Sequence, residues 1–441
     1  MSDAERRFRT LSADLLADLR SSEVLLLNHV GEDTHFLRLN RNQVRNAGHV
    51  HQESLRVELI DAERAAMATV PLSGHRDGDL AQAREVLDRL RAQLSHLPPD
   101  PFLHFATERC DTRHCSDGRL PPAQDAAEDL IAAGGDLDLV GSLAWGEMTF
   151  GFANSLGQFN WHSDDSFHAD WSVHGDDRGA VKQSYSGFAW EREFVAGKLA
   201  YARDTLGLLQ RTPKVLSPGR YRAFLEPTAL NGLLQIVGSE GFGLKSHRTA
   251  QSPLLRMSRD GVRLNEQVSL VENHAGGRTP RFNQAGFIKP EEVELVRDGV
   301  YGAALADPRS AKEYGEAVNC ANEHPESLEM AGGALHQDHI LDTLDTGIYL
   351  SDLWYCNLSD RSRCRITGMT RFACLWVEHG EPVAPINVMR FDESMYFVLG
   401  DGLVALTEEH ERIFDTTTYE RRSEASAMVP GALVDGFRFT L

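Results

Sequence analysis

The sequence predicts an α+β protein, in which an N-terminal helix-on-antiparallel-sheet domain precedes a C-terminal, mostly antiparallel and barrel-like β domain. Leucines recur at helical spacing over residues 11–19, whereas apolar and polar residues alternate strictly over residues 54–59. Beyond residue 237, strand-like runs and turns dominate. A chain of 441 residues also exceeds the usual size of one hydrophobic core, so two or three domains are expected.

The N-terminal half alternates between helical and strand periodicity. After the first helix come four strand-like runs, at residues 22–28, 35–40, 44–57 and 64–70. A second helix is predicted at residues 79–94, and the prolines at 98–101 end it because proline lacks a backbone donor. The remaining elements are an amphipathic helix, two aromatic-rich strands, and a strand end followed by a helix, at residues 123–133, 143–152, 158–174 and 185–209.

A short segment with two prolines and a glycine separates the two predicted domains. This linker, residues 211–220, places the domains at residues 1–215 and 216–441. A strand at 221–226 and a helix at 227–237 open the second domain. Later elements include a strand at 348–355, a polar loop at 357–365, and a hairpin that pairs 372–377 with 383–388 around Glu378-His379-Gly380-Glu381.

Charge and composition exclude several classes of function. The net charge of −20 would repel a polyanion, so no nucleic-acid partner is expected. The sequence contains no apolar run of about 18 residues and no apolar segment close behind its charged N-terminus, which predicts a cytoplasmic protein without a membrane partner. The six cysteines form no Cys-x-x-Cys pair; Cys110 and Cys115, with His114 between them, resemble only half of a zinc site.

Two groups of polar side chains have spacings that suit a functional site. His336, Asp338 and His339 offer two imidazoles and a carboxylate for a metal ion, although the same residues also suit the first turn of a helix. His162, Asp164 and His168 share one strand face by their even spacing. A substrate groove, a ligand set and a solvated strand face each explain this second group. His49 and His51 also share a strand face, for which a solvated strand pair is the simplest explanation.

Several motifs follow one another along the chain in a definite order. The most specific lies in residues 347–391 and reads Gly-Ile-Tyr-Leu-Ser-Asp-Leu-Trp-Tyr-Cys-Asn-Leu-Ser-Asp-Arg, then Thr-Gly-Met-Thr-Arg-Phe-Ala-Cys-Leu-Trp-Val. The others are Gly-Phe-Ala-Asn-Ser-Leu-Gly at 151–157, Asn-Trp-His-Ser-Asp-Asp-Ser-Phe at 160–167, Gln-Ala-Gly-Phe-Ile-Lys-Pro at 284–290 and Asp-Gly-Phe-Arg-Phe-Thr-Leu at 435–441. In this order the motifs resemble the TldD/PmbA family, whose best-known members form a zinc metallopeptidase from two related chains.

The resemblance also indicates where a metal site would lie. In the catalytic chains of the family, a helix carries a His-Glu-x-x-x-His sequence, and a cysteine near the C-terminus completes the zinc site. In this sequence Leu234, Gln235 and Ser239 occupy the corresponding positions, and no cysteine follows Cys374. Leucine cannot bind zinc, and glutamine is a poor general base.

The resemblance therefore implies the metal-free, TldE/PmbA-like kind of chain, with no catalytic residue and no cofactor of its own. Such a chain would pair with a TldD-like zinc-bearing subunit in a heterodimer that cleaves peptides or unfolded segments. Two alternatives remain at this point. One is a stand-alone metal-dependent hydrolase that uses His336, Asp338 and His339. The other is a peptide-binding assembly protein with no proteolytic role.

Overall fold

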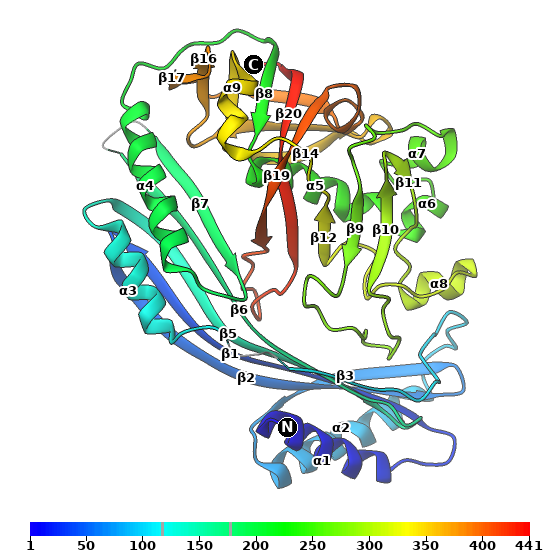
Figure 1. Ribbon diagram of the computed structural model, residues 1–441. Coiled ribbons are helices and arrows are strands. Elements are labelled where there is room, and N and C mark those ends of the chain that lie inside the picture. Colours follow the sequence, from blue (N-terminus) through cyan, green and yellow to red (C-terminus); the bar gives the residue numbers. More distant parts are fainter. Residues whose placement is uncertain (116–118, 176–178) are drawn as a thin grey trace.

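The computed structural model describes residues 1–115, 119–175 and 179–441. It contains two large sheets, one built from each half of the chain (Figure 1). The first sheet curves beneath the second, and two long connections of the C-terminal half reach down to it. The arrangement is α+β, as the sequence predicts. The boundary between residues 215 and 216 stays a prediction.

The first sheet is built from long strands. Within the described residues its order is β3-β2-β1-β5-β6-β4, with β7 beside β6, and β4–β6 is its parallel pair. Long antiparallel ladders of this kind place successive side chains on opposite faces, so each face has its own composition. The strands are β1 (Val24–Asn40), β2 (Gln43–Asp61), β3 (Arg64–Leu72), β4 (Asp111–Cys115), β5 (Asp138–Asn154), β6 (Phe159–His174) and β7 (Ala180–Gly187).

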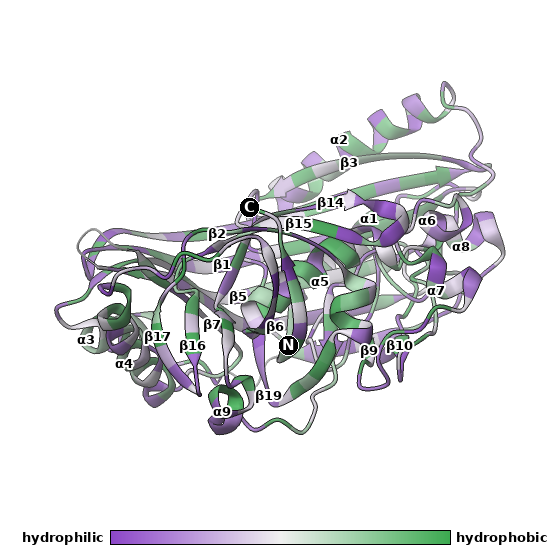
Figure 2. Cartoon of the chain, turned by 90° about the horizontal axis from the view of Figure 1, so that it is seen from above, coloured by the Kyte–Doolittle hydropathy of each residue, from purple (hydrophilic) through white to green (hydrophobic). Residues whose placement is uncertain are grey.

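Two helix pairs cover the ends of the outer face of this sheet. They are α1 (Asp3–Ala17) with α2 (Arg76–Leu94), and α3 (Ala123–Gly134) with α4 (Arg192–Leu209). Seen from above, α3 and α4 lie at one end and α1 and α2 toward the other (Figure 2). The α1 side chains Leu11 and Leu15 are buried, as their helical spacing predicts, and Phe8 is buried beside them. Each contributes roughly 1.5–3 kcal/mol by leaving water.

The two faces of β6 differ in chemistry. Its odd-numbered residues Phe167, Trp171 and Val173 are buried in the core that α3 and α4 share. Its even-numbered residues include Asp164 and Ser166, which bond to residues 278 and 424 of the C-terminal half. Strand β6 therefore turns apolar side chains toward the helices, and polar side chains on its other face bond to the second half of the chain.

The second sheet is open and branched in the part of the chain that the structure describes, rather than barrel-like. Its main path runs β11-β10-β9-β12-β20-β8-β13-β16-β17, while β14, β15, β18 and β19 branch from it. The pairs β12–β20 and β13–β8 are parallel, so the sheet is mixed. Its strands are β8 (Gly219–Leu225), β9 (Leu270–Asn273), β10 (Glu292–Arg297), β11 (Val300–Tyr301), β12 (Ser327–Met330), β13 (Gly347–Leu350), β14 (Asp352–Asp360), β15 (Arg365–Arg371), β16 (Leu375–Glu378), β17 (Glu381–Pro385), β18 (Arg390–Ser394), β19 (Leu403–Phe414) and β20 (Ser426–Phe439).

The longest helix of this half, α5 (Pro227–Gly241), packs in the largest apolar core. A proline opens it, where the missing N–H has no intrahelical partner to lose. Shorter helices and turns complete this half: α6 (Leu244–Arg248), α7 (Leu255–Asp260), α8 (Pro308–Tyr314), η1 (Gln337–His339), α9 (Ile340–Leu344), η2 (Arg361–Arg363) and η3 (Phe397–Asp401). No helix in the described residues is long and apolar enough to span a membrane.

Four predicted elements differ from the structure. The runs at 22–28 and 35–40 are one strand, because residues 29–34 pair with both β2 and β5. The strand predicted at 348–355 is divided at Ser351 into β13 and β14, which join different partners. Much of the loop predicted at 357–365 is strand, since β14 continues to Asp360. The hairpin is confirmed: β16 pairs with β17, and His379 and Gly380 both have positive φ.

Candidate functional site

Helix α5 carries the positions at which the family resemblance places a zinc motif. Leu234 is 1% exposed and lies in the largest apolar core. Gln235 and Ser239 are exposed, and the Ser239 hydroxyl donates to the carbonyl oxygen of Ile236 at 2.9 Å. Zinc requires imidazole, thiolate or carboxylate ligands, and these three side chains supply none. The residues at this position therefore do not fit a zinc ion.

The alternative metal residues lie in an exposed turn at the start of α9. The Nδ1 atom of His336 accepts a hydrogen bond from the backbone N–H of Asp338 at 3.2 Å, as a helix-capping side chain does. The rings of His336 and His339 are 6.1 Å apart. His336, Asp338 and His339 are all exposed, and they are not among the groups of described residues whose ligand atoms lie within 4.8 Å of one another.

Strand β6 brings His162, Asp164 and His168 to one face, as their even spacing predicts. That face is buried: the three residues are 3%, 0% and 3% exposed. They lie where the first sheet meets the C-terminal half, so they are not a solvated strand face. A substrate could reach them only if the segments that cover them moved.

Asp164 is the centre of a charged cluster on this face. Its Oδ1 accepts a hydrogen bond from the Arg278 guanidinium at 3.1 Å, and its Oδ2 lies 3.5 Å from Nε2 of His114. His114 is beside His162 in the parallel β4–β6 pair, and the two rings stack with centroids 4.7 Å apart. Burial raises the pKa of Asp164, while Arg278 and His114 act in the opposite direction. Although His114, His162 and Asp164 could converge on a metal ion, the Arg278 cation already fills one oxygen of Asp164 and opposes a second cation.

The buried histidines His162 and His168 of β6 are neutral at physiological pH. Burial, with smaller contributions from the neighbouring His114 and Lys289, lowers the pKa of His162 to about 3. Burial lowers the pKa of His168 to about 4, with a further contribution from Arg422. Neither ring therefore supplies a positive charge that could hold an anionic substrate.

A loop between β19 and β20 closes the same face farther along β6. Arg422 is 1% exposed, and its guanidinium donates to Ser166 O at 3.0 Å, Ser166 Oγ at 2.6 Å and Gly146 O at 2.8 Å. Ser166 Oγ in turn donates to Glu424 Oε1 at 2.9 Å. These bonds connect the polar face of the first sheet to the C-terminal half, so the described contacts assign this face a role in joining the two halves.

A second buried cluster lies within the C-terminal half. Glu272 accepts backbone N–H bonds from Glu326 and Ser327 at 3.0 Å, and its Oε1 lies 3.3 Å from His274 Nε2. Lys289, which is 2% exposed, donates to Glu326 at 2.9 Å. Burial raises the pKa of Glu272 to about 7 and lowers the pKa of His274 to about 4. The ligand atoms of Glu272, His274 and Glu326 converge, but the Lys289 ammonium already neutralises the site.

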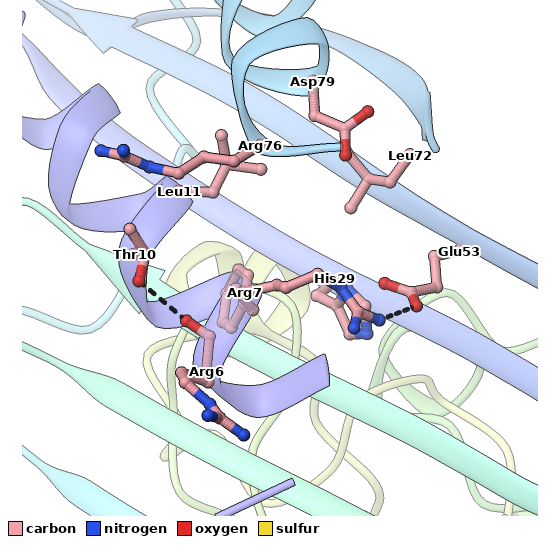
Figure 3. A pocket seen from close by; sticks show the side chains of 10 residues that line it. Arg6, Arg7, Thr10, Leu11, His29, Glu53, Leu72, Arg76 and Asp79 are labelled. Carbon is pink, nitrogen blue, oxygen red and sulfur yellow. Dashed lines mark hydrogen bonds and ion pairs between the residues drawn. The ribbon is translucent and has the colours of Figure 1, made fainter. Parts of the chain in front are cut away.

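A pocket of about 180 Å³ opens between α1 and the first sheet (Figure 3). Arginines gather at this pocket, which would suit an anion, but each is paired: Arg7 with Glu53, Arg6 with Asp3, and Arg76 with Asp14. The buried His29 at its base has a pKa lowered to about 3 by burial and by Arg7. The pocket therefore offers no free positive charge for a ligand.

Sequence reasoning missed the partners of Asp164 and the whole Glu272 cluster. His114 is noticeable in the sequence only between two cysteines, whereas in the structure its partner is His162, 48 residues later. Arg278 is 114 residues from Asp164. The motif around Lys289 is visible in the sequence, but its pairing with Glu326 depends on the tertiary fold.

Comparisons with known proteins agree with this architecture. Residues 218–441 match the family model of the PmbA/TldA metallopeptidase C-terminal domain. No curated protein gives a significant match. The fold is similar to that of TldE from Thermococcus kodakarensis, with 13% identity, a TM-score of 0.77 and coverage of 100% of both chains.

Two further structures, both of proposed DNA gyrase modulators, share this fold. The one from Thermotoga maritima has 13% identity and a TM-score of 0.75, over 99% of this chain and 100% of that chain. The one from Bacteroides thetaiotaomicron has 17% identity and a TM-score of 0.71, over 100% of this chain and 99% of that chain. At these identities the likeness shows the fold alone. Because the family match spans just over half of the chain, this protein belongs to the TldD/PmbA/TldE metallopeptidase-type family.

Proposed function

We propose that this chain is the non-catalytic, TldE/PmbA-like subunit of a cytoplasmic, heterodimeric zinc metallopeptidase that cleaves peptides or unfolded segments. The observation that carries this proposal is the composition of α5, where Leu234, Gln235 and Ser239 replace the residues that would bind and use zinc. Leu234 is part of the core, so a ligand could not take its place without a loss of packing. The zinc would belong to a TldD-like partner.

In such a complex the partner's zinc would activate the water that attacks the peptide carbonyl. This chain would enclose and orient the substrate. An extended peptide can add to the exposed edge of a sheet through main-chain hydrogen bonds. The described strand β3 lies at one end of the first sheet and is a candidate for such an edge.

A nucleic-acid role has less support. Two of the similar structures are named as proposed modulators of DNA gyrase. The net charge of −20 opposes contact with phosphate, and this proposal therefore includes no nucleic acid.

The test is reconstitution with a TldD-like chain. Peptide cleavage by each chain alone and by the mixture is measured with and without a chelator. We expect cleavage by the mixture, its loss with chelator, and no cleavage by this chain alone. Chelator-sensitive peptidase activity of this chain alone would contradict the proposal.

Matched variants locate the chemistry. Gln235→Ala and Ser239→Ala alter exposed side chains and should leave the activity of the mixture unchanged. Substituting a histidine of the partner's zinc motif by alanine should abolish that activity. If Gln235→Ala instead removes most of the activity, this chain contributes to catalysis and the proposal is wrong.

A further inference from the structure

The outer face of the first sheet carries polar residues in the interval between its two helix pairs. On β1, the odd-numbered Leu25 and Leu27 pack in the core of α1 and α2, and Leu39 packs in the core of α3 and α4. Between them, Asp33 and His35 point to the same face but are not in either core. Figure 1 shows β1 and β2 passing between the two helix pairs.

The strand register brings four ligand-type side chains together there. Asp33 is opposite His51, and His35 is opposite His49, in the antiparallel β1–β2 ladder. The His35 and His49 rings stack with centroids 4.5 Å apart. His49 Nε2 lies 2.7 Å from Asp33 Oδ1, and His51 Nδ1 lies 3.0 Å from Asp33 Oδ2. The ligand atoms of Asp33, His35 and His49 all lie within 4.8 Å of one another.

We propose that Asp33, His35 and His49 form a binding site for a zinc-class divalent metal ion. Two imidazoles and a carboxylate are a ligand set that zinc uses, and three protein ligands leave one tetrahedral position for water. For an ion to bind between them, His49 Nε2 and Asp33 Oδ1 must move apart by about half an ångström, because two ligand atoms of one zinc ion lie farther apart than two hydrogen-bonded atoms. His51 holds the other oxygen of Asp33 and so orients this carboxylate, as supporting residues do in metal sites.

Neighbouring charges favour a cation at this place. Glu147 on β5 is opposite Asp33, and Asp165 on β6 is opposite Glu147, so three carboxylates form a row across the sheet. Unlike the clusters around Asp164 and Glu272, the contacts that the structure describes at Asp33 include no lysine or arginine. The side chains of Asp33 and His49 are each 46% exposed, so an ion can enter from solvent.

The test is zinc binding by the full chain after removal of metal with a chelator, measured by isothermal titration calorimetry and by thermal unfolding. The wild type should bind one zinc ion and unfold at a higher temperature with zinc. Excess Mg²⁺ should not displace zinc, since it does not favour imidazole.

The double variant His35→Ala/His49→Ala should weaken zinc binding at least ~10-fold. Loss of a residue that only orients a metal ligand already has an effect of this size, and this variant removes two ligands. The matched control is His336→Ala/His339→Ala, which also removes two exposed histidines but from another place. It should bind zinc like the wild type. Absence of zinc binding by the wild type, equal binding by the His35/His49 variant, loss of binding in the control, or displacement by Mg²⁺ would each overturn the proposal. None of these outcomes depends on a proteolytic partner, so this site and the proposed function can fail separately.

Discussion

Asp164 shows how much one buried charge depends on partners that are distant in the sequence. The residue is 0% exposed, and its carboxylate is held by Arg278. An isolated carboxylate at such a place would cost several kcal/mol, whereas a paired one can be tolerated. The even spacing in the sequence places Asp164 on one face with His162, but the choice of Arg278 as its cation depends on the contact between the two halves.

Removal of this cation should destabilise the protein. We expect Arg278→Met to lower the free energy of unfolding by about 3 kcal/mol at neutral pH, because Asp164 stays buried without its partner. Adding Asp164→Asn should recover part of that loss. Urea unfolding of the single and double variants measures the coupling, with Arg297→Met, whose side chain is 71% exposed, as the control. If Arg278→Met lowers the free energy of unfolding equally in the wild type and in Asp164→Asn, the two side chains are not coupled.

Glu272 should make stability depend on pH. Its pKa is about 7 in the folded protein, against a reference value of 4.5, because of burial. Between these values the folded state holds a proton that the unfolded state has lost, so this carboxyl stabilises below pH 4.5 and the effect disappears as pH rises through 7.

The variant Glu272→Gln keeps the size of the side chain and removes its titratable carboxyl group. Relative to the wild type, its free energy of unfolding should increase by ~2–3 kcal/mol between pH 4.5 and pH 8, from 1.36 kcal/mol per pKa unit. Urea unfolding at both pH values of both proteins provides the comparison. A constant difference between the two would mean that Glu272 does not titrate in this range.

At the scale of elements, local patterns predict well the helices that bury one face. Helix α1 follows its leucine spacing, and α5 begins at the predicted proline. Strand ends are less predictable. Residues 29–34 look polar and contain Gly31, yet β1 runs through them because β2 and β5 hold both edges. Hydrogen bonds to a strand on each side compensate for the weak local preference of these residues for a strand. The sequence pattern of the segment carries no information about those neighbouring strands.

Helix α5 offers a direct test of the structural role of Leu234, which lies in the largest apolar core. Leu234→Ala should lower the free energy of unfolding by about 2–5 kcal/mol, since it opens a cavity in the largest core. Gln235→Ala, on the exposed side of the same helix, should change it by less than about 0.5 kcal/mol. Chemical denaturation distinguishes them. Similar costs at the two positions would contradict the packing assigned to Leu234.

At the scale of the whole molecule, the two halves meet through a polar layer on β5 and β6, beside which apolar clusters also join them, as Phe152 and Phe282 do. Arg422 and Arg278 reach from the C-terminal half to the backbone and the side chains of β5 and β6. The same layer contains buried imidazoles and carboxyls whose pKa values shift in opposite directions. Their effects on stability partly cancel, so the pH dependence of the whole protein is informative only when single groups are removed.

His168 is a suitable group for this purpose. Its folded pKa of about 4 lies below the reference value of 6.5, so it contributes stability above pH 6.5 that is lost as pH falls toward 4. The variant His168→Asn should not show this loss. The wild type should therefore lose ~3 kcal/mol more of its free energy of unfolding than the variant between pH 7 and pH 4. Urea unfolding across this range measures it, with the exposed His379→Asn as the control. If the difference stays constant with pH, His168 is not the neutral buried group described.

The sequence by itself determined the α+β class, most helices, the hairpin at His379-Gly380 and the family resemblance, because these depend on periodicity, turn chemistry and motif order along the chain. It also determined that the positions to which the family resemblance assigns the zinc motif are occupied by Leu234, Gln235 and Ser239, none of which is a usual zinc ligand. Only the tertiary structure decided that the face of His162, Asp164 and His168 is buried, that Arg278 and Arg422 bond to it, and that Asp33, His35 and His49 converge. Strand register and the packing of distant segments determine those contacts, and neither is encoded in the spacing of neighbouring residues.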